Sequence, residues 1–352
     1  MSKWSKFIRN DSIRLVYFMT FAFMLVWISS PGMAAPPLKA LIVDGQNNHD
    51  WKATTPILKE ILEECGLFSV DVATSPEPGK PMDSFKPEFS AYNVVVLNYT
   101  GDDWPADTQK AFVDYVQNGG GVVVFHAANN AFPNWKEFNE IIGIGGWGGR
   151  NEKSGPMVRY RGGKMALDDS PGAGGTHGAQ REYEVVIRDK EHPITKGLPE
   201  VWMHAKDELY ANLRGPAKNL HILATSPSKV SKENEPVLFT IQYGKGRVFH
   251  DALGHGPYAM SCAGFAFTLQ RGAEWAATGQ VTLTDIPENF PTPYEVRFRP
   301  RPISLEAIKQ YKFGESRKAL SDVEESIRTV APSQRKQIEQ KMIDVLNDGD
   351  AT

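Results

Sequence analysis

The chain has 352 residues and a formal net charge of −3, with 39 basic and 42 acidic side chains. Because these charges nearly balance and no long basic run occurs, the sequence does not favour a nucleic-acid partner. Hydrophobic residues make up 41% of the chain, which is enough to bury a proper core. The length permits one large domain with an appendage, or two domains.

Residues 1–34 have the pattern of a secretory signal peptide. An apolar segment at 15–28 follows a basic start, and Gly32 and Ala34 place small residues at the two positions that specify cleavage. We therefore expect cleavage after about Ala34 and a periplasmic or secreted mature protein. The alternative is an uncleaved membrane anchor, although the apolar segment is shorter than the ~20 residues of a spanning helix.

The first half of the mature chain alternates between strands and helices. A helix is expected to start with Thr54 as its cap and Pro56 in its first turn, and to end at Gly66. A second helix is predicted over 106–116. The predicted strands cover 39–43, 69–73, 94–97 and 122–125. Continuous apolar strands separated by amphipathic helices indicate an α/β fold whose mainly parallel sheet is covered on both faces.

The second half is less regular. The glycine-rich segment 143–178 is too long for a simple connection, and such segments tend to be functional. Strands are predicted at 183–187 and 220–224, a hairpin at 237–242 and 246–250, and a closing helix at 265–277. Residues 284–352 are interpreted as a proline-rich linker and a small helical appendage, with helices at 305–311, 316–329 and 333–346. These helices are a candidate surface for a protein partner.

Polar side chains follow several of the predicted strands. His49, His126, His250 and His255 each come directly after a strand or close to its end. Because ligands of open α/β sheets bind at the carboxyl ends of the strands, we expect these residues to line one cleft. His204, Asp207 and Glu208 form a further group, in which a carboxylate can orient an imidazole or share a metal ion. His192 is interpreted as a turn residue and His221 as a structural or exposed one.

Several known motifs are absent. The glycines of 143–149 do not follow a strand of a βαβ unit, so no nucleotide cofactor is expected. No Gly-x-Ser-x-Gly occurs, and a nucleophile at Ser261 or Cys262 lacks the strand-to-helix context that would activate it. Cys65 and Cys262 are the two cysteines. They could pair in an oxidising compartment, although Cys65 sits on the apolar side of a predicted helix.

The chain from about 38 to 282 resembles the ThuA-like (trehalose utilisation) family. The resemblance rests on Asn48-His49-Asp50-Trp51, on 119–128 (GGGVVVFHAA), on 192–199 (HPITKGLP), on 207–210 (DELY) and on 243–249 (YGKGRVF) leading to Leu253-Gly254-His255. It implies a class I glutamine-amidotransferase-like fold, a flavodoxin-like three-layer sandwich, over 37–283. It also implies a role in the metabolism of trehalose-like disaccharides or of sugars oxidised at carbon 3. Amidotransferases of this fold carry a cysteine nucleophile after a strand. Here that position reads His126-Ala127-Ala128, so glutamine hydrolysis is not expected.

We therefore expect an exported enzyme, a lyase, hydrolase or isomerase, that acts on a small carbohydrate by histidine-based acid–base chemistry. A divalent metal ion is a candidate cofactor. The predicted catalytic residues are His49, His126, His204, Asp207, Glu208 and His255. The predicted substrate contacts are Asn48, Trp51, Asn129, Trp147, His177, Tyr210 and His250. The candidate metal ligands are His126, His204, Glu208 and His255. Trp51, Trp104, Trp135 and Trp147 are candidates to stack on sugar rings.

Two rival hypotheses remain open. In the first, the chain is a non-catalytic carbohydrate-binding or accessory module that uses the same cleft. In the second, Cys262 is the nucleophile of a hydrolase.

Overall fold

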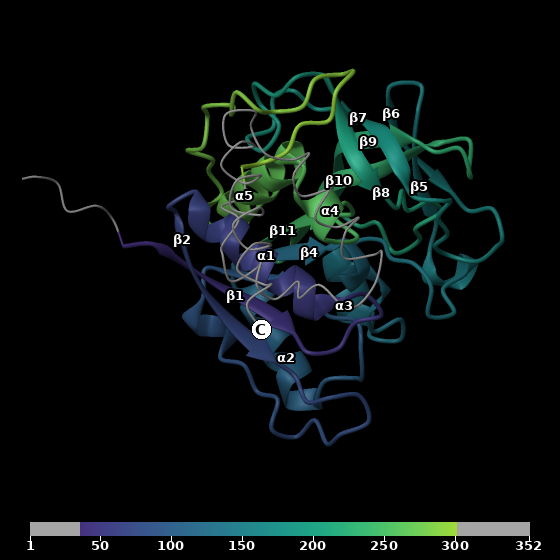
Figure 1. Cartoon of the computed structure of the whole chain (residues 1–352). Coiled ribbons are helices and arrows are strands. Elements are labelled where there is room, and N and C mark those ends of the chain that lie inside the picture. Colours follow the sequence, from purple (N-terminus) through teal and green to yellow (C-terminus); the bar gives the residue numbers. More distant parts are fainter. Residues whose placement is uncertain (1–35, 301–352) are drawn as a thin grey trace, which may run out of the picture. The chain divides into compact units, whose positions relative to one another are not determined.

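The computed structural model describes residues 36–300 (Figure 1). The predicted signal peptide at 1–34 and the predicted tail helices at 305–311, 316–329 and 333–346 lie outside the described residues. Within 36–300, no helix is long and apolar enough to cross a membrane. From Pro37 onward the described residues belong to one compact unit.

A nine-stranded sheet forms the centre of the described part of the chain. Its strands are β1 (Leu38–Asp44), β2 (Phe68–Thr74), β3 (Val94–Leu97), β4 (Gly121–Phe125), β7 (Arg181–Ile187), β8 (Val201–Asp207), β9 (Leu220–Pro227), β10 (Asn234–Tyr243) and β11 (Gly246–Asp251). The spatial order is β2-β1-β3-β4-β11-β10-β9-β7-β8. The pairings from β2 to β11 are parallel, and those from β11 to β8 are antiparallel. The α/β class is confirmed, and the parallel half of the sheet is the half that the apolar strand runs predict.

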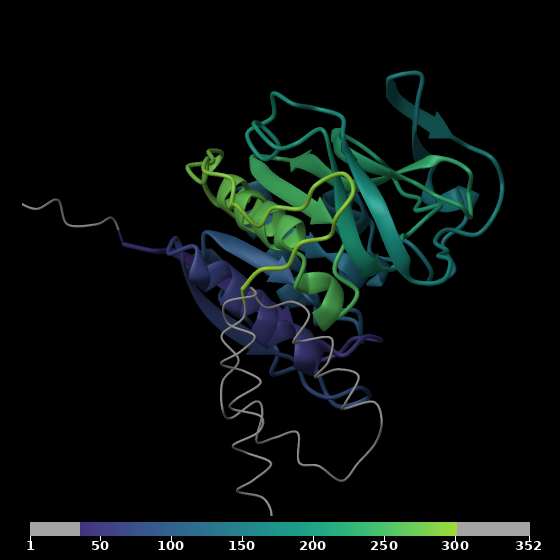
Figure 2. The ribbon, with the colours of Figure 1, turned by 45° about the horizontal axis from the view of Figure 1, so that its top comes forward.

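Helices cover both faces of the parallel half, which gives the expected three layers (Figures 1 and 2). The helices α1 (Trp51–Glu64) and α5 (Ala263–Thr278) share one core with Val96 and Phe249. The helices α2 (Ala106–Gln117) and α3 (Lys136–Ile142) pack on the other face with Val95 and Val124. The strands β3 and β4 are therefore buried on both sides, as their uninterrupted apolar sequences require.

The first helix begins earlier than its sequence suggested. Asp50, not Thr54, is the cap, because its side chain accepts a hydrogen bond from the backbone N–H of Ala53 at 3.1 Å. Thr54 and Thr55 are buried inside α1, where their hydroxyls each accept a hydrogen bond from the side-chain amide of Asn98 at 3.0 Å. These two threonines link the helix to the end of β3 instead of capping it.

The glycine-rich segment contains structure that the sequence did not reveal. It includes the hairpin β5 (Met157–Arg161) and β6 (Lys164–Asp168) and the short helix η3 (Glu152–Ser154). The strand β8 and the helix α3 were also missed. The remaining short helices are η1 (Phe89–Ala91), η2 (His126–Asn130) and α4 (Pro257–Met260). The polar residues of β8 interrupt its apolar pattern, which explains why the sequence did not identify it.

Residues 284–300 pack on the domain. Ala263 donates its backbone N–H to the carbonyl of Arg297, and Arg299 donates to that of Ser261, both at 2.9 Å. Phe290 is buried against Trp202 and Phe267. In Figure 2 this yellow-green segment runs alongside α5. The packed unit therefore continues past residue 283, where the sequence places the start of a linker.

Candidate functional site

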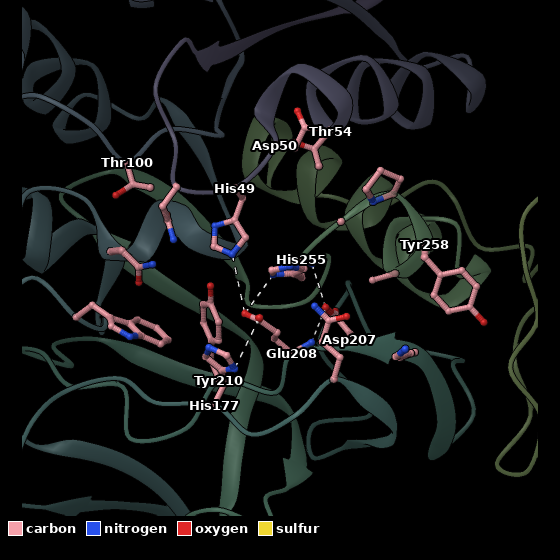
Figure 3. A pocket seen from close by; sticks show the side chains of 18 of the residues that line it. His49, Asp50, Thr54, Thr100, His177, Asp207, Glu208, Tyr210, His255 and Tyr258 are labelled. Atoms are coloured by element: carbon pink, nitrogen blue, oxygen red, sulfur yellow. Dashed lines mark hydrogen bonds and ion pairs between the residues drawn. The ribbon is translucent and has the colours of Figure 1, made fainter. Parts of the chain in front are cut away.

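A pocket of about 880 Å³ opens at the carboxyl ends of the parallel strands. Residues that follow five different strands meet there with residues of the glycine-rich segment (Figure 3). The lining includes Asn48, His49, Asp50, Thr54, Thr100, Asn130, Trp147, His177, Gln180, Lys206, Asp207, Glu208, Tyr210, His255 and Tyr258. The position agrees with the rule that α/β sheets bind ligands at this edge.

Four side chains gather at the base of this pocket. His49, His126, Glu208 and His255 each present one nitrogen or oxygen atom, and these atoms all lie within 4.8 Å of one another. We call this group the histidine–glutamate cluster. The rings of His49 and His255 meet edge to face with their centroids 4.5 Å apart, and that of His126 lies 5.0 Å from His49. The cluster unites residues from the ends of β1, β4, β8 and β11.

His126 is the deepest member of the cluster. It is the first residue after β4, and its φ of +41° lies in the left-handed region, which non-glycine residues rarely adopt. Its Nδ1 lies 2.9 Å from the carbonyl oxygen of Ala252, so we assign the proton to Nδ1. Nε2 is buried and has no hydrogen-bond partner. Burial lowers the pKa of His126 to about 4, so at neutral pH the ring presents a lone pair to the cluster.

Glu208 holds the exposed side of the cluster together. Its carboxylate lies 3.1 Å from Nδ1 of His255, 3.9 Å from Nε2 of His49 and 3.7 Å from Nδ1 of His177, contacts drawn as dashed lines in Figure 3. Burial opposes ionisation, but hydrogen bonds with His255 and His49 hold the pKa of Glu208 below its usual range. Burial disfavours the charged ring of His255, yet the Glu208 carboxylate raises the pKa of His255 above its usual value.

Asp207 positions the residues around it. One carboxylate oxygen accepts hydrogen bonds from the backbone N–H groups of Glu208 (2.8 Å) and His255 (3.0 Å). The other accepts from the N–H of Gly254 (2.7 Å) and lies 2.8 Å from Nε2 of His204. Burial disfavours the charged ring of His204, but the hydrogen bond to Asp207 raises its pKa to about 10. The pair fixes the turn that carries His255. His204 itself is fully buried and does not line the pocket.

The turn at Gly254 depends on a residue without a side chain. Its φ is +94°, and a Cβ atom there would lie 2.6 Å from the ring of Phe125. Glycine therefore lets the chain leave β11 and bring His255 over the cluster.

The glycine-rich segment forms one wall of the pocket, as its length suggested. Trp147 and His177 both line the pocket, and the ring of Trp147 meets that of Tyr210 at 4.7 Å. The buried Arg150 holds this wall in place by donating to the backbone carbonyls of Asn130, Ala131 and Gly146, at 2.7–3.1 Å. An irregular segment with few ladder hydrogen bonds is thereby fixed by a buried guanidinium.

Several predicted site residues lie elsewhere. Asn129 and His250 are fully buried and do not line the pocket. The Asn129 side-chain amide lies 3.1 Å from Nε2 of His250, and Nδ1 of His250 lies 2.9 Å from the carbonyl oxygen of Ile142 in α3. Their predicted substrate contacts are therefore not supported by their positions. Trp51 does not line the pocket either. Trp104 and Trp135 pack into an aromatic core with Phe89, Phe112 and Phe132.

The remaining histidines and the cysteines lie away from the pocket lining. His192 is in a turn, where its Nδ1 accepts the N–H of Ile194, and His221 forms an exposed ion pair with Asp189. Cys65 and Cys262 are both free thiols. Cys262 is fully buried beside His204 and does not line the pocket, so it cannot attack a ligand bound there.

Asn130, one of the polar residues that follow the strand at 122–125, lines the pocket as the strand-end rule predicts. Sequence reasoning missed other residues of the pocket, namely Thr54, Thr100, Gln180, Lys206 and Tyr258. Tyr258 follows β11 by a few residues, so a longer window after that strand would have included it. Gln180 and Lys206 have no such signal, because they depend on how the glycine-rich segment and β8 fold.

Comparison with known proteins identifies the family. The family model ThuA, described as "Trehalose utilisation", matches residues 39–276. The chain belongs to the ThuA family. A ThuA-like protein from Parabacteroides merdae, known from a crystal structure, is 51% identical over 75% of this chain and 98% of its own, with a TM-score of 0.73.

More distant structures also match. A ThuA-like protein from Bacteroides uniformis is 20% identical over 72% of this chain and 96% of its own, with a TM-score of 0.49. The search of curated proteins finds no match. Membership of the ThuA family suggests a carbohydrate function related to trehalose utilisation. The Asn48–Trp51, His126 and Asp207–Tyr210 motifs that carry the resemblance lie around the cluster or beside it.

Proposed function

We propose that this ThuA-family protein is an enzyme that processes a keto-sugar, such as a 3-keto-glycoside derived from a trehalose-like disaccharide. The observation that supports this best is the histidine–glutamate cluster at the base of a pocket of about 880 Å³. A cavity of this size is within the range of small-molecule sites. Trp147 and Tyr210 offer aromatic faces for a sugar ring, and Asn48, Asn130 and Gln180 offer polar groups for its hydroxyls.

The chemistry that fits the pocket is proton abstraction from the carbon next to a carbonyl group. We assign the base to His177, since its Nδ1 lies 2.9 Å from the carbonyl of Gly178, which leaves Nε2 as the proton acceptor. His126 is a poorer choice than the sequence suggested, because it does not line the pocket and burial lowers its pKa to about 4. His49 lines the pocket but lies inside the cluster.

The proposed reaction is an elimination. The C–H bond next to the carbonyl breaks, its proton moves to Nε2 of His177, and its electron pair forms an enolate. The hydroxyl of Tyr210, which lines the pocket beside the cluster, donates a hydrogen bond that stabilises the enolate oxygen. The enolate then re-forms the carbonyl and expels the oxygen substituent on the next carbon. This oxygen leaves with the electron pair of the broken C–O bond and takes the proton from Nε2 of His177, which restores the base. The products are an unsaturated keto-sugar and a free alcohol or sugar.

The test compares turnover and binding in the same variants. We expect the wild-type protein to release the free sugar from a 3-keto-disaccharide, and His177→Ala to lose this activity while it still binds the substrate in calorimetry. His221→Ala is the matched control, because His221 is an exposed histidine outside the pocket lining. If the wild type binds the sugar but does not convert it, the protein is a carbohydrate-binding module instead.

We also propose that the enzyme acts outside the cytoplasm. The signal-peptide pattern of residues 1–34 supports this. Mass spectrometry of the mature protein should find a new N-terminus near residue 35 in a periplasmic or secreted fraction. An intact N-terminus on soluble cytoplasmic protein would contradict export.

A further inference from the structure

We propose that the histidine–glutamate cluster binds one divalent ion of a first-row transition metal. Within residues 36–300, these four side chains bring at least three potential metal ligands close together. A second observation, which does not depend on the distances between the four side chains, concerns His126. Nε2 of His126 is buried, lacks a hydrogen-bond partner and belongs to a ring whose other nitrogen is already held. A buried polar atom without a partner costs stability, unless a ligand completes the site.

The donor set selects the class of ion. Three imidazoles and one carboxylate suit Zn, Fe, Ni, Co or Mn, whereas Mg and Ca prefer oxygen ligands. The donors lie within 4.8 Å of one another. Donors of a tetrahedral zinc ion, at ~2.0–2.1 Å from the metal, lie roughly 3.4 Å apart, so side-chain movements of about 1 Å close the site. Rotation about the side-chain bonds of His255 and His49, which are only partly buried, can provide such movements.

Contacts outside the donors orient two of the rings. His126 donates Nδ1–H to the carbonyl of Ala252. Nδ1 of His49 lies 3.3 Å from the side-chain oxygen of Asn47, whose amide donates in turn to Asn98. Both rings therefore present Nε2 to the centre of the cluster. Histidines that bind metals in proteins are held in this way, with the outer nitrogen donating to a carbonyl or carboxylate oxygen.

The site is open on one side, which is typical of catalytic metal sites and not of structural ones. His49, Glu208 and His255 line the pocket, while His126 lies buried next to them and does not line it. A ligand in the pocket can therefore reach the ion. A divalent metal there would polarise a carbonyl or hydroxyl oxygen without a proton transfer. The inference does not depend on which sugar the pocket binds.

The experiment measures metal binding in the absence of any sugar. The purified protein is stripped with a chelator and titrated with Zn²⁺, Mn²⁺, Ni²⁺ and Co²⁺. Bound metal is measured by elemental analysis, and bound Co²⁺ also by its visible absorption. We expect one ion per chain. Glu208→Gln and His126→Asn should abolish stoichiometric binding, and Asn47→Ala, which removes no donor, should weaken it about 10–100-fold.

His177→Ala is the matched control. His177 lines the same pocket and lies 3.7 Å from the Glu208 carboxylate, but it is not part of the cluster. This variant should bind the ion as tightly as the wild type. Circular dichroism of each stripped variant shows whether it is folded.

Failure of the wild type to bind any of the four ions would overturn the inference, as would undiminished binding by folded Glu208→Gln and His126→Asn. Since His177-dependent sugar turnover is measured separately, the failure of one proposal is distinguishable from the failure of the other.

Discussion

Replacing Asp207 with asparagine tests the claim that this carboxylate builds the pocket. Both of its oxygens are fully used, by three backbone N–H groups and by the ring of His204. An asparagine has one acceptor oxygen, so its NH₂ group must face two of these donors and leave them unpaired. Breaking a buried ion pair by removing one charge costs about 3–5 kcal/mol. We expect Asp207→Asn to lower the free energy of unfolding by about this amount.

The measurement is equilibrium unfolding in urea, followed by fluorescence. Asp189→Asn is the matched control, because Asp189 also pairs with a histidine and accepts backbone N–H groups, but near the surface. It should cost only about 1 kcal/mol, as exposed ion pairs do. If both variants lowered the free energy of unfolding by only about 1 kcal/mol, the reasoning would be refuted. The buried ion pair of Asp207 would then contribute no more than the exposed pair of Asp189.

Three further predictions concern stability. Zn²⁺ at ~100 times its dissociation constant should stabilise the stripped protein by about 2.7 kcal/mol, or roughly 5–10 °C in calorimetry, and an equal rise in Glu208→Gln would contradict the metal site. Burial lowers the pKa of His192 to about 4, so stability should fall as the pH drops from about 6.5 toward 4, because the unfolded chain then binds the extra proton. His192→Gln should show a shallower loss in urea titrations at pH 7 and 5, and an unchanged loss would count against this assignment. In Gly272→Ala, the new Cβ would lie 2.0 Å from the buried ring of Phe249, so we expect a loss of about 1–3 kcal/mol in urea, and a stabilised variant would contradict the close packing of α5 on β11.

Local patterns were enough to predict the parallel half of the fold. The apolar runs at 94–97 and 122–125 became β3 and β4, and the residues directly after β1, β4 and β11 supplied three members of the cluster. These three residues were predicted by the rule that ligands of open α/β sheets bind at the carboxyl ends of the strands. This rule needs only the positions at which the strands end. The antiparallel half was harder. His204 and Asp207 lie on a strand whose polar residues are buried as a pair, so β8 did not show the alternation of an exposed strand.

The sequence could not distinguish the cluster from its surroundings. His204 was a candidate ligand, but its ring faces Asp207 and supports the turn. His250 was predicted for the same reason as His255, because both lie near the end of β11. Its side chain instead contacts the carbonyl oxygen of Ile142 in α3. A side chain near the end of a strand can point to either face of the sheet. The register of the strand and the turn that follows decide which face it takes. In this chain Gly254 makes that turn, and its effect on His255 appears only in three dimensions.

The most direct test of the proposed function follows the hydrogen atom next to the carbonyl group. A 3-keto-glycoside is incubated in D₂O with the metal-loaded protein, and the proton signal of the carbon beside the carbonyl is followed by NMR. The wild type should remove this signal much faster than buffer alone, whether or not product forms, and His177→Ala should not. If the wild type leaves the signal at the buffer rate with every divalent metal, the pocket does not perform this chemistry.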